Sequence, residues 1–128
     1  METWEFDFEW LRIRHYVKKC LELSSLPDLQ AILFMIGLQE YGNWIEKKSF
    51  SKEEKQDLMH IAICALLESD GYYKFVGRDQ DGWPHYKNLK PFTIKGIKTQ
   101  ENLIKNKIIE YFNLHDQETE IYIKRNND

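Results

Sequence analysis

Asp57 and His60 are the pair of residues with the most chemical potential in this sequence, because they lie three residues apart at the start of a segment that is apolar from Leu58 to Leu67. On a helix, residues three apart share a face, so the carboxylate can orient the imidazole or join it in binding a metal, as Glu-x-x-His pairs do in di-iron bundles. We expect His60 to be buried and bonded to Asp57 or the backbone, with no cofactor. The metal-binding alternative uses Asp57 and His60, helped by His15 or Glu40.

The turn from Asp79 to Gly82 contains the aspartates and the glycine of a calcium-binding loop. A full EF-hand loop that starts at Asp79 needs a carboxylate at its twelfth position, which is Lys90 in this chain. Aspartate and glycine are also ordinary turn residues. We therefore interpret Asp79, Asp81 and Gly82 as turn chemistry.

Large side chains that often anchor interfaces lie around this turn: Arg78 before it and Trp83, His85 and Tyr86 after it. Trp, Tyr and Arg are enriched among the residues that carry binding energy. We predict Arg78, Trp83, His85 and Tyr86 as a binding surface. The alternative is that Trp83 and Tyr86 fold back over the end of the helical core. The sequence has no catalytic Ser, His and Asp spacing, no Gly-rich phosphate loop and no Cys-x-x-Cys, so we expect a protein that is not an enzyme.

Length and composition favour a single domain with a real core, because 128 residues are 42% hydrophobic and 14% aromatic. The net charge of -3 gives no global attraction for nucleic acid or an anionic membrane. Lysines gather between residues 87 and 107, which we interpret as a solvated face, a phosphate or acidic-partner patch being the alternative. Cys20 and Cys64 lie in apolar patterns as free thiols, and no signal peptide or spanning segment is visible. These features predict a soluble, cytoplasmic protein.

Apolar periodicity predicts four helices. The first covers residues 6–23, although Trp4, Phe6, Phe8 and Trp10 alternate with acidic residues as in a strand. The second follows Pro27 and Asp28 and ends at Gly42, and the third starts at a capping box of Ser51 and Glu54 and ends at Gly71. Both are apolar on almost every face, so both must be buried. The fourth covers residues 99–113.

A β-hairpin is predicted over residues 72–88, between the third and fourth helices. Pro84 cannot donate to a strand ladder, so the returning strand is an edge or begins after it. Residues 115–128 form a tail that is partly disordered or contains a short strand at 121–123. The predicted fold is mainly α, a compact bundle of about four helices with two central apolar helices and this hairpin, in one domain over residues 1–114.

Two helices that are apolar all round need more cover than two amphipathic helices and a hairpin supply, which favours a homodimer or another protein as partner. We interpret the chain as a non-enzymatic interaction or structural module that acts through self-association or a protein partner. A metal-binding or small-ligand-binding bundle using Asp57 and His60 is one alternative. A winged-helix-like, nucleic-acid-binding protein is the second, because a helix followed by a hairpin is similar in order to that fold. The acidic character of residues 51–70 argues against nucleic acid.

Overall fold

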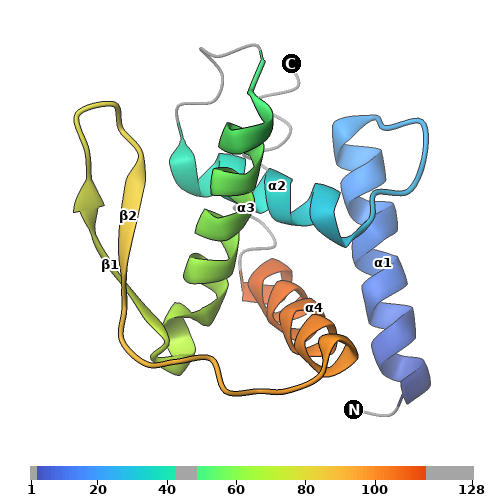
Figure 1. Ribbon diagram of the computed structural model, residues 1–128. Helices are drawn as coiled ribbons and strands as arrows, with labels where there is room; N and C mark the ends of the chain where they lie inside the picture. The colour runs from blue at the N-terminus through green and yellow to red at the C-terminus, as the bar shows by residue number, and fades with distance from the viewer. Residues whose placement is uncertain (1–2, 43–48, 115–128) are drawn as a thin grey trace. The chain divides into compact units, whose positions relative to one another are not determined.

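The computed structural model describes residues 3–42 and 49–114. These residues form four α-helices, with a two-stranded antiparallel hairpin between the third and the fourth, which confirms the mainly α prediction (Figure 1). The elements are α1 (Thr3–Leu21), α2 (Leu29–Tyr41), α3 (Lys52–Leu67), the 3-10 turn η2 (Glu68–Asp70), β1 (Tyr73–Arg78), β2 (Pro84–Asn88) and α4 (Ile97–Leu114). The strand predicted at 121–123 and the rest of the tail lie outside the described residues.

The described residues separate into two compact units. The first unit combines residues 3–32 with 96–114, and the second combines 33–42 with 49–95. Helix α2 begins in the first unit and ends in the second. The single domain expected over residues 1–114 stays a prediction.

Helix α1 includes the segment whose alternating pattern also suited a strand, and it begins at Thr3, three residues before the predicted start. It ends at Leu21, two residues before the predicted end. The cause is Glu22, which has a φ of 54°, in the left-handed region that stops a helix. The N–H of Leu23 then donates to the carbonyl of Lys18 at 3.0 Å, which closes the helix end.

In the first unit, α1 and α4 contact each other. Ile13 and Val17 of α1 are each 1% exposed, and the ring of Tyr16 meets the ring of Phe112 edge to face, with centroids 5.8 Å apart. Ile13 and Val17 lie four residues apart, so they share the face of α1 that is buried.

The predicted start signals of α2 and α3 are both confirmed. Asp28 accepts a hydrogen bond from a backbone N–H in the first turn of α2 at 2.9 Å. Ser51 and Glu54 form a reciprocal capping box at the start of α3. Gly42 follows α2 with a φ of 85°, and Gly71 stands after the 3-10 turn that extends α3. The starts of α2 and α3 and the end of α2 therefore follow from local sequence, whereas the α-helical part of α3 ends at Leu67, before the predicted Gly71.

The second unit depends on a close approach between the backbones of α2 and α3. A β-carbon built on Gly37 would lie 2.0 Å from the carbonyl oxygen of Leu58, which is far inside van der Waals contact. Gly37 is buried in the middle of α2. Glycine in a helix interior usually costs roughly 0.5–1 kcal/mol relative to alanine. Glycine is nevertheless required at position 37, because no side chain fits between the two helices.

Tyr41, Leu58 and Ile61 form a buried cluster beside this approach. The indole of Trp83 stacks on the ring of Tyr41, with centroids 4.5 Å apart and an interplanar angle of 17°. Tyr86 packs against the same cluster. Trp83 and Tyr86 therefore fold back over the helical core, as one of the two alternatives expected.

The hairpin lies alongside α3, and both of its strands contact that helix (Figure 1). Phe75 pairs with Tyr86, and a register shift follows between Phe75 and Gly77. Pro84 is the first residue of β2 and pairs with Arg78 at the turn end of the ladder. In a two-stranded sheet each strand is an edge, so the constraint expected from Pro84 is satisfied.

Gly37→Ala is expected to destabilise the protein by about 1–3 kcal/mol, because the new methyl group forces α2 and α3 apart. The direction of the change in unfolding free energy is diagnostic, since Gly→Ala in an ordinary helix interior stabilises by about 0.5–1 kcal/mol. Urea unfolding followed by far-UV circular dichroism measures the difference. Ala31→Gly, at an exposed position of α2, is the matched control and should lose only the propensity difference. A Gly37→Ala variant more stable than the parent would contradict the close approach.

Candidate functional site

An open groove of about 580 Å³ lies between α3 and the hairpin in the second unit. It is lined from α3 by Glu54, Asp57, His60, Ile61 and Cys64, and from the hairpin by Asp79, Trp83, Pro84, His85 and Tyr86. The groove thus combines the two metal-ligand candidates with three of the four predicted binding residues. Arg78, the fourth, is not among the lining residues.

His60 is exposed in the groove, so the expectation of a buried His60 bonded to Asp57 is wrong. Its Nε2 lies 3.5 Å from the Sγ of Cys64, one turn further along α3. The ring also meets Tyr73 of β1 edge to face, with centroids 6.1 Å apart. The groove leaves the face of α3 that carries His60 open, although Ile61 and Ala62, the next two residues of the helix, are buried.

Cys64 is the buried member of this pair, at 2% exposure. Burial raises the pKa of its thiol to about 11, against a smaller lowering by a backbone hydrogen bond. The thiol is therefore neutral near pH 7, and neutral thiols are poor nucleophiles and poor metal ligands. Within residues 3–42 and 49–114, no group of three or more His, Cys, Asp or Glu side chains is placed to hold a metal ion. The metal-binding alternative stays a prediction.

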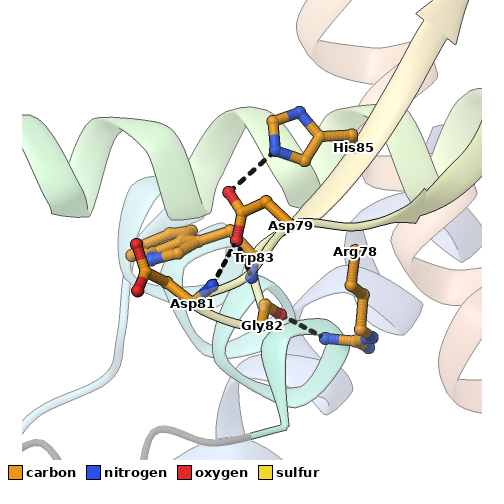
Figure 2. A network of polar contacts seen from close by, with 6 residues as sticks. All are labelled: Arg78, Asp79, Asp81, Gly82, Trp83 and His85. Atoms are coloured by element: carbon orange, nitrogen blue, oxygen red, sulfur yellow. Dashed lines mark hydrogen bonds and ion pairs between the residues drawn. The ribbon is translucent and has the colours of Figure 1, made fainter.

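Asp79 organises the turn at one end of the groove (Figure 2). Its Oδ1 accepts hydrogen bonds from the backbone N–H groups of Asp81 at 2.9 Å and Trp83 at 3.0 Å, and its Oδ2 lies 2.9 Å from Nε2 of His85. The hydrogen bond from His85 is the main cause that lowers the pKa of Asp79, and the two backbone donors act in the same direction. This is the turn chemistry expected from the sequence, with His85 added to it.

The ionised form of Asp79 is expected to stabilise the fold, because its pKa is lower in the folded state. That stabilisation is present above the ordinary aspartate pKa of about 3.9 and is lost as the pH falls through the lower folded value. Thermal unfolding between about pH 6 and pH 3 measures it.

Asp79→Asn should lower the melting temperature near pH 6 and flatten its fall towards acid pH, because the substituted chain has no carboxylate to protonate at this position. Asp81→Asn removes the same charge from the same turn and is the control. Asp81 contributes its backbone N–H to the network, while its carboxylate points away (Figure 2). Equal pH profiles for the two variants would contradict the role of Asp79.

Arg78 ties the hairpin to the end of α2. Its guanidinium donates hydrogen bonds to the carbonyl oxygens of Glu40 and Tyr41 at 2.7 Å each, and to that of Gly82 at 2.8 Å. The last carbonyls of a helix have no partner within the helix, and a cation there also favours the helix dipole. Arg78 therefore holds the turn in place beside the groove that it does not line.

Arg78→Met is expected to destabilise the protein by about 1–3 kcal/mol, because it leaves the carbonyl ends of α2 without these donors. Arg78→Lys should recover only a part, since a single ammonium cannot reproduce the planar fork that bridges several carbonyls. Urea unfolding of the three proteins gives the order. Lys74→Met, on an exposed position of β1, removes a cation without such contacts and serves as the control. A fully stable Arg78→Met variant would contradict this assignment.

Trp83 and Tyr86 form the aromatic part of the groove, and both are half-buried. The pKa of the Tyr86 hydroxyl is raised, first by burial and then by the nearby carboxylates of Glu40 and Glu68. Tyr86 is therefore a neutral phenol at physiological pH. The two rings give the groove a rigid wall that is fixed by the core beneath it.

Several lysines of the predicted basic run already contact other side chains of the chain. The Nζ of Lys90 lies 4.4 Å from the ring centroid of Tyr72, and that of Lys105 lies 5.4 Å from the ring of Trp10. Lys107 is 3.3 Å from a carboxylate oxygen of Glu110. These contacts occupy three of the lysines, and the Lys107 side chain is only 10% exposed, so the run is not one uniformly solvated face; the phosphate or acidic-partner patch stays a prediction.

The sequence did not identify Glu54, Cys64 and Asp79 as groove residues, because each already had a sufficient structural role. Glu54 caps α3, Cys64 fits an apolar pattern and Asp79 fits a turn. One signal was available. Glu54, Asp57, Ile61 and Cys64 follow one another at steps of three, four and three, which places them on one helical face.

No helix in the described part of the chain combines the length and the apolar character needed to cross a membrane. Comparison with models of protein families, with curated proteins and with solved structures finds no match to this chain. Its function must therefore be argued from the groove and from the surfaces of the two units.

Proposed function

We propose that the protein is a non-enzymatic interaction module whose groove between α3 and the hairpin binds a basic side chain of a protein partner. The observation that carries this proposal is the charge of the groove. Glu54, Asp57 and Asp79 contribute carboxylates, and none of the described residues that line it is Lys or Arg. A cation entering the groove therefore meets carboxylates and neither lysine nor arginine among these lining residues.

The aromatic wall supports the same ligand chemistry. Trp83 and Tyr86 present ring surfaces, and the faces of aromatic rings attract ammonium and guanidinium groups. Trp83 is held by its stack on Tyr41, and the turn before it is held by Asp79 and Arg78. A site fixed before binding loses little conformational entropy when its ligand arrives. Of the predicted binding residues, Trp83, His85 and Tyr86 would then contact the partner, and Arg78 would act by positioning them.

The two alternative functions find different support in this groove. His60 and Cys64 lie 3.5 Å apart, so a zinc ion that displaced the thiol proton would find two ligands there, with Asp57 one turn away. The groove gives less support for nucleic-acid binding, because the carboxylates of Glu54 and Asp57 on the open face of α3 repel phosphate. We therefore retain the metal as a competing ligand in the test.

Titration with a hexalysine peptide, followed by ¹H–¹⁵N correlation spectra at low salt, tests the proposal. The amides of Asp57, His60 and His85 and the indole N–H of Trp83 are expected to shift, and the shifts should shrink as salt is added. Asp57→Asn should weaken binding about two- to fivefold, as expected for one exposed charge pair. Asp70→Asn, which removes a charge outside the groove, should leave the affinity unchanged. Hexaglutamate should cause no shift in the groove.

Shifts spread evenly over acidic residues of both units would show nonspecific attraction and would contradict a groove site. Zinc added alone gives the second comparison. Saturable shifts confined to His60 and Cys64, lost in Cys64→Ser, would favour the metal-binding alternative over a basic partner.

A further inference from the structure

Helix α1 carries more large apolar side chains than the first unit buries. Its four aromatic residues alternate in sequence, so on a helix they divide into two pairs on opposite faces. Phe6 and Trp10 are half-buried, whereas Trp4 is 70% and Phe8 61% exposed. Leu11, 43% exposed, continues the exposed pair at helical spacing. We name Trp4, Phe8 and Leu11 the α1 stripe.

A groove of about 590 Å³ lies beside the α1 stripe, between α1 and the end of α4. Trp4 and Phe8 form part of its lining, and Ile109 and Asn113 contribute from α4. A ridge of apolar side chains next to a groove is the shape that packs against another helix. Large apolar side chains exposed next to one another are a feature of interaction sites.

The charges along α1 indicate which helix fits. Acidic residues occupy its first half, at Glu5, Asp7 and Glu9, and basic residues occupy its second half. The basic residues are Arg12, Arg14, Lys18 and Lys19. Two copies of α1 placed antiparallel bring each acidic half against a basic half, whereas a parallel pair brings like charges together. The helix dipoles also favour the antiparallel pair.

We propose that the α1 stripe binds the α1 stripe of a second copy of this chain, with the two helices antiparallel about a two-fold axis. A two-fold interface must be self-complementary, and the polarity of α1 meets that condition. Phe8 then packs across from Leu11 of the second copy, and Glu5 comes within reach of Arg12 of the second copy. This interface lies in the other unit from the groove that binds the proposed basic partner, so either proposal can fail without the other.

The location differs from the one that composition suggested. Helices α2 and α3 were expected to need a partner as cover, but Ile32, Met35 and Ile36 of α2 and Leu58 and Leu67 of α3 are already buried within the chain. The large exposed apolar side chains of a single helical face are on α1 instead. Self-association is therefore assigned to a different helix.

Sedimentation equilibrium of the full chain tests this proposal. We expect a species of twice the 15.5 kDa chain mass, with a dissociation constant of about 10–100 µM, as is usual for small interfaces. Phe8→Gln should raise the dissociation constant at least about tenfold, because a two-fold interface loses the side chain twice. Ile97→Gln is the matched control, since Ile97 is 79% exposed outside the stripe and should leave association unchanged.

Charge exchange tests the antiparallel arrangement. Glu5→Arg and Arg12→Glu should each weaken self-association, because each places like charges together at two symmetric positions. An equimolar mixture of the two variants should form a heterodimer, detected by native mass spectrometry, because both contacts then join opposite charges again. Circular dichroism confirms that each variant keeps its helices.

The proposal is overturned if the full chain remains a monomer at several hundred micromolar. A monomer that dimerises only after residues 115–128 are removed would show that the chain covers its own stripe, and would overturn it as well. Dimers that persist unchanged in Phe8→Gln would place the interface elsewhere.

Discussion

The second unit is organised by the absence of a side chain at Gly37. Without a β-carbon, α2 approaches the backbone of α3 at Leu58, and this contact sets where the carbonyl end of α2 lies. Arg78 reaches that end and binds the carbonyls of Glu40 and Tyr41, so the hairpin is positioned relative to both helices. The groove exists because these two contacts hold the hairpin beside α3 while leaving one face of the helix open. The missing side chain of Gly37 thus controls the geometry of a groove that Gly37 itself does not line.

Much of this architecture could be predicted because it depends on local chemistry. Caps at Asp28 and Ser51, glycines after α2 and η2, and the strand-forming residues of the hairpin act over a few positions, and the structure places them as expected. The register of contacts between distant segments could not be predicted in this way. Gly37 shows why: within its helix it looks like an unfavourable residue, and its reason is a backbone carbonyl twenty-one positions later in the chain.

The groove was predictable in its parts and not as a whole. The side-chain types of Trp83, His85 and Tyr86 indicate a binding surface, and the three residues do line one groove, but nothing in their spacing places them opposite Asp57 and His60. The error at His60 has the same origin. An apolar sequence pattern indicates that most faces of a helix are buried. It does not show which face is left uncovered by the neighbouring element. Asp79 has two roles, because it organises a turn and also lines the groove. Its residue type and position indicate only the turn, so sequence analysis does not reveal the second role.

The aromatic side chains of the second unit differ in exposure from those on the exposed face of α1, and this difference bears on what each surface can recognise. In the second unit, rings are engaged by other rings: Trp83 stacks on Tyr41, and Phe34 meets Phe50 edge to face. Its groove therefore offers fixed ring surfaces among carboxylates, which suits a charged group that needs orientation. On α1, by contrast, Trp4 and Phe8 are exposed side by side, and exposed rings gain most from simple burial. A groove with stacked rings and carboxylates and an exposed apolar stripe are chemically different surfaces, so the proposed basic side chain and the proposed second copy would not compete for the same residues.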